Sequence, residues 1–299
     1  MWHARGWRKW ANGGQWVKFS VLLSLYAAEQ AAYLAQCLAS LVTQTLAADE
    51  VVLVLDGEVS ADLHAVIAEY QPRLPLVIVP LACNVGLGRA LQHGLAACTH
   101  DWVLRMDTDD ICVPTRFAQQ VAFINAQPDI SVLGGQVLEF AGGWPPTDAT
   151  AQTLKTVPLC HADIARYAKS RNPINHMTVA LHKPTVLAVG GYRHAPLYED
   201  YDLWVRLLLA GARFANLPNV LVYARAGAAM YQRRGGWQYA RLEWQMQHAF
   251  YRQGFVSWQQ VAKNLAMRVP VRLLPNALRA WVYGTILRQR ARSTPPTAG

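Results

Sequence analysis

Three carboxylates crowd into the tetrapeptide Asp107-Thr108-Asp109-Asp110. Such groups repel one another unless a cation or solvent lies between them. Oxygen-only ligands suit a hard cation such as Mg²⁺ or Mn²⁺, and a cation held by one or two carboxylates keeps positions open for phosphate oxygens. The tetrapeptide therefore predicts either a metal site for a phosphate-bearing ligand or a solvated acidic turn that caps the next helix.

A second acidic cluster, Glu199-Asp200-Tyr201-Asp202, opens a predicted helix. Carboxylates near a helix N-terminus are stabilised by the helix dipole, so capping explains the cluster without any chemistry. The alternative is a general base, since a positioned carboxylate can accept the proton of a reacting hydroxyl group.

Asp56 and Arg89 carry weaker signals. Asp56 precedes Gly57, and it either caps its own turn or accepts a hydrogen bond from a nucleobase or ribose. Arg89 follows the glycine-bearing turn Asn84–Gly88, where the chain can approach a ligand closely. This arginine either pairs with a phosphate or stays in solvent.

Four short apolar segments in the first half predict buried strands, at residues 19–26, 51–55, 76–81 and 102–106. Helices are predicted between and after them, at 29–44, 61–70, 89–98 and 114–126. This alternation predicts an α/β fold with a mostly parallel sheet flanked by helices. Ligands of such sheets bind at the carboxyl ends of strands, which is where Asp56 and the Asp107–Asp110 tetrapeptide fall.

The second half is less regular. It predicts strands at 130–140, 177–181 and 220–223, and helices at 184–189 and 200–210. The C-terminal region is basic and aromatic, and predicts helices at about 236–252, 257–268 and 275–291. Pro270 and Pro275 are expected to separate the last two helices, because proline breaks a helix interior.

Composition excludes several classes of protein. Of the 299 residues, 53% are hydrophobic and 16% are charged, which excludes a disordered chain. No apolar run approaches the roughly 20 residues that span a bilayer, and the basic N-terminus lacks the apolar core of a secretory signal. Five scattered cysteines without a CxxC pair fit a reduced, cytosolic chain.

Charge divides the chain into three parts. Residues 1–18 carry a net charge of +4 and residues 225–299 one of +11, which leaves −6 for the middle. We expect a basic N-terminal arm at 1–18, an α/β domain at 19–225 and a basic, aromatic helical region at 226–299. The basic ends indicate an anionic partner, either a membrane surface or a nucleic acid.

Six motifs in unbroken order resemble those of family 2 glycosyltransferases with the GT-A fold, above all bacterial enzymes of capsular, exopolysaccharide and O-antigen synthesis. They are FSVLLSLY at 19–26, VVLVLDG at 51–57, NVGLGRALQHGL at 84–95, VLRMDTDD at 103–110, NHMTVALHK at 175–183 and GGYRHAPLYEDYDLWVRLLLAG at 190–211. The resemblance covers residues 19–225 and extends weakly to YQRRGG at 231–236.

The resemblance implies a nucleotide pocket. Asp56 would contact the base, which favours a uridine donor, and Leu25 and Tyr26 would line the pocket. Arg89 would lie near the nucleotide, and the Arg233-Arg234 pair would close over the diphosphate.

The resemblance also implies catalytic groups. Asp107 and Asp109 would form the family's DxD pair on Mn²⁺ or Mg²⁺, with Asp109 the more direct ligand. Asp200 would be the catalytic base, paired in sequence with Glu199.

The implied function is transfer of a hexose from a nucleotide-diphosphate sugar, favoured as UDP-sugar, with inversion. The expected acceptor is a saccharide on a polyprenyl diphosphate, which places the chain in the cytoplasm at the inner face of the cell membrane. We expect an anionic membrane surface as partner, contacted by a helix at 275–291 with Leu278, Trp281, Val282 and Ile286 on one side.

Three alternatives stay open. The basic ends suggest a nucleic-acid-binding protein, although the predicted sheet edge is acidic and no nucleic-acid motif is present, so we expect no nucleic-acid partner. A sugar nucleotidyltransferase would have a glycine-rich loop with a lysine after the first strand, where Tyr26-Ala-Ala-Glu-Gln stands here. An inactive homologue is the third alternative, and the retention of Asp109 and Asp200 counts against it.

Overall fold

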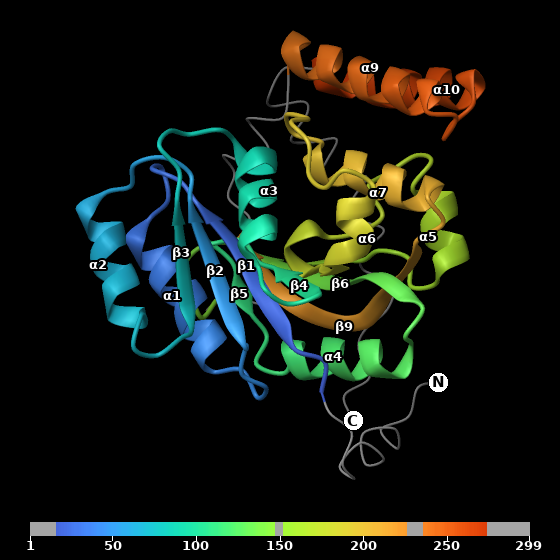
Figure 1. The fold of residues 1–299 in the computed structure, drawn as a ribbon. Coiled ribbons are helices and arrows are strands. Elements are labelled where there is room, and N and C mark those ends of the chain that lie inside the picture. The colour runs from blue at the N-terminus through green and yellow to red at the C-terminus, as the bar shows by residue number, and fades with distance from the viewer. Residues whose placement is uncertain (1–15, 147–151, 226–235, 274–299) are drawn as a thin grey trace.

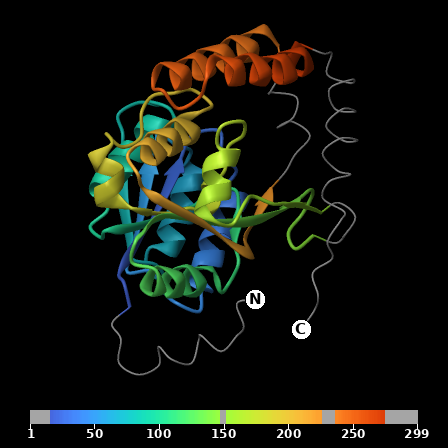
Figure 2. The ribbon, with the colours of Figure 1, turned by 90° about the vertical axis from the view of Figure 1, so that its right-hand side faces the viewer.

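A nine-stranded sheet with helices on both faces forms the body of this computed structural model (Figure 1). The structure describes residues 16–146, 152–225 and 236–273. Two further helices lie across one end of the body, as the turned view shows (Figure 2).

The sheet is parallel in its first half and mixed in its second. Its strand order is β3-β2-β1-β4-β8-β6-β9-β5, with β7 paired to β6. The ladders among β1 to β4 are parallel, whereas β8 runs antiparallel to both β4 and β6. The strands are β1 (Phe19–Leu25), β2 (Glu50–Leu55), β3 (Leu76–Pro80), β4 (Trp102–Arg105), β5 (Ile111–Cys112), β6 (Ile130–Phe140), β7 (Thr153–Lys155), β8 (Ala180–His182) and β9 (Arg213–Arg225).

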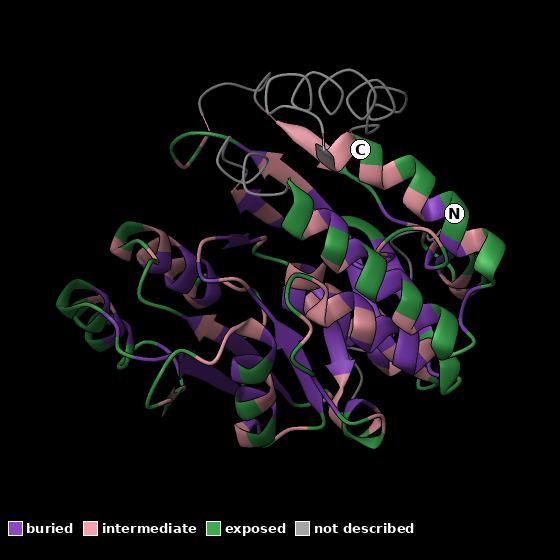
Figure 3. Ribbon diagram, turned by 90° about the horizontal axis from the view of Figure 1, so that it is seen from above, coloured by how far each residue is buried: buried purple, intermediate pink, exposed green. Residues whose placement is uncertain are grey.

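Two apolar layers cover the sheet. Helices α1, α2 and α4 bury their apolar stripes on one face, and α3, α5, α6 and α7 bury theirs on the other. The helices are α1 (Ala31–Val42), α2 (Ala61–Tyr70), α3 (Leu87–Ala97), α4 (Arg116–Ala126), α5 (His161–Tyr167), the 3₁₀ turn η2 (His176–Thr178), α6 (Lys183–Ala188), α7 (Glu199–Leu209), α9 (Trp237–Arg252) and α10 (Trp258–Leu273). Seen from above, the strands are mostly buried while outer helix surfaces are exposed (Figure 3).

The direction of the chain reverses across the sheet between β1 and β4. From β1 the chain adds β2 and then β3 on one side, and it returns to add β4 on the other. A switch of this kind opens a crevice at the carboxyl ends of the strands, where α/β proteins bind their ligands. Tyr26 follows β1, Asp56 follows β2, and the Asp107–Asp110 tetrapeptide comes one residue after the end of β4, so the expected site lies at this crevice.

The second half departs from the sequence predictions in several places, and β7 and α5 have no counterpart among them. The strand expected at 220–223 is the end of β9, which begins at Arg213 and pairs in parallel with β6. The strand expected at 177–181 is replaced by η2 followed by β8. The helix expected at 257–268 continues as α10 through Pro270.

The prediction that Pro270 separates two helices is wrong. Arg268 and Arg272, one turn apart on either side of Pro270, both bind the Glu243 carboxylate of α9. These two charged contacts hold the turn around the proline in helical form, which offsets the hydrogen bond that proline removes. The helix expected at 275–291 lies outside the described residues. Among the residues described, no helix combines the length and apolar character needed to cross a bilayer.

Gly94 lets α3 approach the sheet closely. A Cβ added there would lie 2.3 Å from Leu22 Cδ1 and 2.6 Å from Val54 Cγ2, and both side chains are buried. We expect Gly94→Val to lower the free energy of unfolding by about 1–3 kcal/mol through overpacking, measured by urea denaturation. Ala96→Val, at an exposed position of the same helix, is the matched control. An equal loss in both variants would contradict this account of the α3 contact.

Candidate active site

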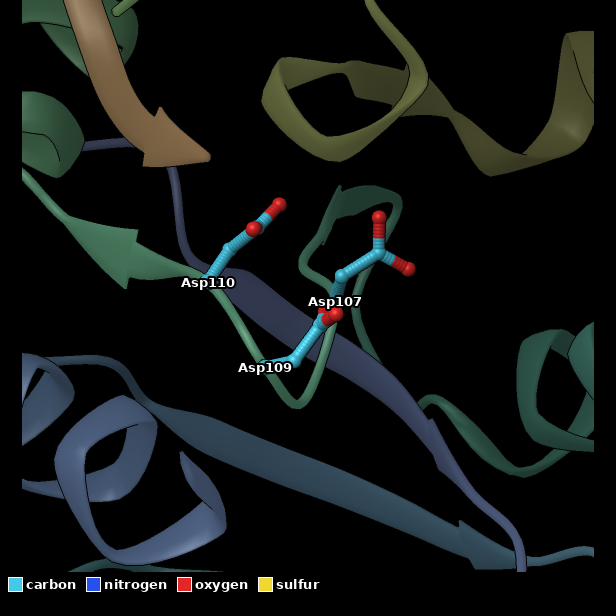
Figure 4. A group of neighbouring side chains, drawn as sticks. All are labelled: Asp107, Asp109 and Asp110. Carbon is cyan, nitrogen blue, oxygen red and sulfur yellow. The ribbon is translucent and has the colours of Figure 1, made fainter. Parts of the chain in front are cut away.

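An acidic turn joins β4 to β5 at the carboxyl edge of the sheet. One carboxylate oxygen each from Asp107, Asp109 and Asp110 lie within 4.8 Å of one another. Figure 4 shows the three side chains leaving a single turn, with the end of β9 next to Asp110. The tetrapeptide is therefore a cluster of converging carboxylates, and Asp110 belongs to it although the sequence analysis named only Asp107 and Asp109 as metal ligands.

Each carboxylate of the turn has a different set of partners. Both oxygens of Asp107 accept hydrogen bonds from the guanidinium of Arg105, one of them at 2.7 Å from Nη1 and the other from Nη2. Asp110 accepts a hydrogen bond of 2.9 Å from the backbone N–H of Arg225. The ionised form of Asp109 is stabilised by its own backbone N–H and by the positive charge of Arg105.

Burial makes this concentration of negative charge costly. Desolvation, followed by the charges of Asp107 and Glu29, raises the pKa of Asp109 to about 7. Desolvation, followed by the charges of Asp107 and Asp109, raises the pKa of Asp110 well above its usual range. A divalent cation would remove this repulsion, and an all-carboxylate set of donors fits a hard cation such as Mn²⁺ or Mg²⁺. Asp107, Asp109 and Asp110 are thus the residues that can hold a metal.

Arg225, the last residue of β9, binds the end of the acidic turn, whereas Arg105 binds its beginning. Its Nε donates to the carbonyl oxygen of Asp109 at 3.2 Å, and its Nη2 donates to Gln36 Oε1 at 2.6 Å. The guanidinium carbon lies 3.8 Å from the ring centroid of Tyr33, within cation–π range. Sequence analysis missed this residue, because nothing local in the sequence indicates that β9 ends beside the turn.

The second acidic cluster begins α7. The Oδ2 atom of Asp200 accepts a 2.5 Å hydrogen bond from Asn172 Nδ2, and its Oδ1 accepts one of 2.7 Å from the backbone N–H of Tyr201. Desolvation raises the pKa of Asp200, and these two hydrogen bonds counteract the rise. Asp200 is therefore a half-buried carboxylate in a fixed orientation, with greater affinity for a proton than a solvated aspartate has.

Glu199 lies where the first turns of α7 and α3 meet. A Cβ added at Gly88 would lie 3.1 Å from Glu199 Cβ and 2.5 Å from the carbonyl oxygen of Arg193, so only glycine allows this approach. Desolvation, together with the charge of Asp200, raises the pKa of Glu199 to about 7.

Arg105 connects the two acidic clusters. Its side chain is 3% exposed, and its positive charge favours the ionised forms of Asp109, Asp110, Glu199 and Asp200 alike. Its Nε is buried without a hydrogen-bond partner among the described residues. The sequence did contain a signal for this residue, because an arginine inside the apolar segment 102–106 must be paired once it is buried.

The residues expected around a nucleotide are placed as follows. Asp56 is 3% exposed, and its carboxylate accepts hydrogen bonds from the backbone N–H groups of Val85 at 2.7 Å and Gly86 at 3.1 Å. It holds the turn before α3, and a direct contact with a base stays a prediction. The Leu25 side chain lies in the core, while Tyr26 beside it is 43% exposed at the crevice.

The predicted cationic contacts to the diphosphate are less constrained. Arg89 is exposed in the first turn of α3. Arg233 and Arg234 lie outside the described residues, so their proposed closure over the diphosphate stays a prediction.

Comparison with known proteins agrees with this geometry. Residues 20–184, more than half of the chain, match the family described as glycosyl transferase family 2. The chain belongs to glycosyl transferase family 2. The amylovoran biosynthesis glycosyltransferase AmsE of Erwinia amylovora is 43% identical to this family 2 chain over 268 residues, which cover 89% of this chain and 97% of that protein.

A second relative and a solved structure extend the comparison. An Escherichia coli family member named UDP-Gal:alpha-D-GlcNAc-diphosphoundecaprenol beta-1,3-galactosyltransferase is 38% identical over 272 residues, 91% of this chain and 97% of that one. Mannosyltransferase PcManGT of Pyrobaculum calidifontis, solved with GDP-Man and Mn²⁺, matches with a TM-score of 0.59 at 17% identity, over 97% of this chain and 83% of that one. The match to PcManGT shows a shared GT-A-like fold.

Family membership confirms the resemblance found in the sequence. This family 2 glycosyltransferase has the expected α/β fold and is related to bacterial enzymes of polysaccharide biosynthesis. The acidic cluster of Asp107, Asp109 and Asp110 corresponds to the expected DxD-like site. Membership also decides for a glycosyltransferase over a sugar nucleotidyltransferase.

The raised pKa of Glu199 predicts a cost to stability at neutral pH. Its pKa in the folded protein is about 7, above the ordinary value of 4.5, so the folded protein binds this proton more tightly than the unfolded chain does. The free energy of unfolding therefore falls as the pH rises from 4.5 to 7. We expect Glu199→Gln to raise the free energy of unfolding by about 1–3 kcal/mol at pH 8, with the gain disappearing toward pH 4.5.

Urea denaturation with EDTA at several pH values measures this gain. Glu58→Gln, at an exposed site, is the control. A gain for Glu199→Gln that does not vary with pH would show that ionisation of Glu199 is not its cause.

Proposed function

We propose that the chain is an inverting, metal-dependent hexosyltransferase. It moves a sugar from a nucleotide-diphosphate donor, favoured as a UDP-sugar, to a saccharide carried on a polyprenyl diphosphate. The observation that carries this proposal is the convergence of three carboxylates at the carboxyl edge of the sheet, together with an Asp200 carboxylate held by two hydrogen bonds. Support also comes from the Escherichia coli relative, whose name states a UDP-Gal donor and a diphosphoundecaprenol-linked acceptor.

Asp107 and Asp109 would hold the metal, with Asp110 completing the set of oxygen donors. When bound, such a cation neutralises the charge that grows on the leaving diphosphate. Arg105 fixes the Asp107 carboxylate and Arg225 fixes the backbone of the turn, so the donors are oriented before any ligand arrives. The electrostatic repulsion among the three carboxylates is thus overcome when the chain folds, and not when the ligand binds. This is the general property of a preorganised site.

Asp200 would act as the catalytic base. It would take the proton of the acceptor hydroxyl while that oxygen attacks the anomeric carbon from the face opposite the leaving diphosphate, which inverts the configuration. The hydrogen bond from Asn172 and the start of α7 hold the carboxylate in place. A raised pKa makes it a stronger base than a solvated aspartate, which favours proton transfer near neutral pH. Glu199 would lie next to this base, and the charge of Asp200 helps to raise the pKa of Glu199.

The nucleotide would lie at the crevice between β1 and β4. Tyr26 presents an exposed ring there, and Asp56 fixes the turn that leads into α3. Arg89 and the Arg233-Arg234 pair would contribute positive charge to the diphosphate. The lipid-linked acceptor would place the enzyme in the cytoplasm, peripheral to the inner face of the membrane, with an anionic membrane surface as its partner.

Metal and nucleotide binding provide the first test. In calorimetric titrations with UDP, GDP and dTDP, we expect UDP to bind with Mn²⁺ and to bind at least tenfold more weakly with EDTA, because the acidic turn repels a diphosphate without a cation. Asp109→Asn should remove this metal dependence. Asp101→Asn, at an exposed position just before β4, is the matched control and should keep it. If no nucleotide binds with or without Mn²⁺, the proposed function is wrong.

The role of Asp200 is tested separately. Asp200→Asn should reduce the rate of transfer from UDP-galactose to a GlcNAc-diphosphate-lipid by about 10²–10⁴-fold, because a general base is lost, and leave UDP binding unchanged. UDP release measures transfer, and calorimetry measures binding. Asp163→Asn, in the first turn of α5, removes a comparable but exposed carboxylate and is the control. Full activity of Asp200→Asn would assign the base to another residue.

A further inference from the structure

The outer surface of the α9–α10 pair has no carboxylate among the residues described. Residues 236–273 contain one acidic residue, Glu243, and its side chain is 0% exposed. Arg268 and Arg272 of α10 each approach its carboxylate to 2.5 Å. The negative charge is therefore neutralised inside the helix pair, whereas the cations Arg241, Arg252 and Lys263 are exposed.

Large apolar side chains are exposed on the same two helices. Trp237 is 75% exposed, and four others are between 44% and 52% exposed: Trp244, Tyr251, Trp258 and Met267. Trp258 contacts the rings of both Trp244 and Tyr251 edge-on, at centroid distances of 6.1 and 6.0 Å. This concentration of exposed aromatic rings is unusual for a solvated surface, and patches of this kind mark interaction sites.

A groove between the helices enlarges the apolar surface. Its volume is about 550 Å³, and its lining includes Trp237 and Trp244 from α9 and Leu265 and Val269 from α10. Arg241 lies at the same groove. In the view from above, α9 and α10 lie nearest the viewer, with exposed and intermediate residues outward (Figure 3).

The opposite side of the pair is already occupied by the protein body. Met246, Phe250 and Val261 are buried in the same apolar cluster as α7. Phe250 contacts the ring of Tyr201 at a centroid distance of 4.9 Å. The exposed aromatic rings are thus left over after the pair has packed on the body, and they form a separate surface.

We propose that this α9–α10 surface binds an anionic phospholipid bilayer. The inference rests on the proposed function, because a lipid-linked acceptor must be met at a membrane. Tryptophan and tyrosine rings favour the headgroup region, and arginine and lysine side chains are attracted to anionic headgroups. The absence of exposed carboxylates on these described helices removes the repulsion that such a surface would otherwise meet. The bilayer contact thus lies on α9 and α10, in addition to any contribution from the helix expected at 275–291.

The same helices are joined directly to the catalytic helix. The hydroxyl group of Tyr198 donates to Glu243 Oε2 at 3.0 Å, and Tyr198 immediately precedes Glu199 and Asp200. Arg272 Nη2 in turn donates to the Tyr198 hydroxyl oxygen at 3.1 Å. A bilayer bound by α9 and α10 would therefore contact helices that are hydrogen-bonded to the start of α7.

Flotation of the full chain with vesicles tests the proposal. We expect binding to vesicles of phosphatidylglycerol and phosphatidylcholine, and at least tenfold weaker binding to phosphatidylcholine alone. Arg241→Glu combined with Arg252→Glu should weaken binding to the anionic vesicles at least tenfold, because two cations that attract anionic headgroups become anions that repel them. Trp244→Ser combined with Trp258→Ser should weaken binding to a similar extent.

Matched changes elsewhere provide the control. Leu187→Ser combined with Arg73→Glu alters an exposed apolar residue and an exposed cation away from α9 and α10, and should leave vesicle binding unchanged. Unchanged binding in both α9–α10 variants, or the absence of vesicle binding by the unaltered chain, would overturn the proposal.

UDP titration without vesicles separates this inference from the proposed function. We expect each α9–α10 variant to bind UDP and Mn²⁺ as the unaltered chain does, which also shows that it is folded. If UDP does not bind but vesicle binding depends on the α9–α10 residues, the surface stands and the proposed function fails. If UDP binds but vesicle binding is unchanged by these substitutions, the proposed function stands and the α9–α10 surface is wrong.

Discussion

The buried ion pair between Arg105 and Asp107 is the interaction on which the site depends. A buried guanidinium without a partner costs several kcal/mol, and Asp107 removes that cost by accepting two hydrogen bonds from it. The pair also fixes the beginning of the acidic turn, so Asp109 and Asp110 converge with Asp107. Because the charge of Arg105 also acts on Glu199 and Asp200, one cation lowers the cost of both acidic clusters.

Close backbone contact brings the two clusters to the same crevice. The first turns of α3 and α7 approach each other at Gly88, where any side chain would collide with Arg193. A second contact holds the loop before α7, because Gln92 Oε1 accepts a hydrogen bond of 2.7 Å from the backbone N–H of Tyr192. The site is therefore built between elements about 100 residues apart in the chain, and its geometry depends on the packing of both helices on one sheet.

Much of the first half could be predicted from the sequence, because its strands are uniformly apolar and its helices carry clear apolar stripes. The acidic residues were placed correctly at strand and helix ends for the same reason. What local patterns do not contain is pairing over long distances. Arg225 meets Asp109 because β9 pairs antiparallel with β5, the strand that directly follows the acidic turn. Asn172 meets Asp200 although η2, β8 and α6 lie between them in the chain. Likewise, Pro270 alone predicts the end of a helix. The helix continues because Arg268 and Arg272, on either side of the proline, both bind Glu243 of α9, and this contact cannot be inferred from the local sequence.

The buried carboxylate of Glu243 bears on how this enzyme can be divided or recombined. Its partners come from α10 and from the loop before α7, so the contact crosses the boundary at residue 226 that charge alone suggests. A chimera joined at that boundary would combine a tyrosine from one parent with a carboxylate and arginines from another. A chimera that keeps this contact therefore takes Tyr198, Glu243, Arg268 and Arg272 from the same parent.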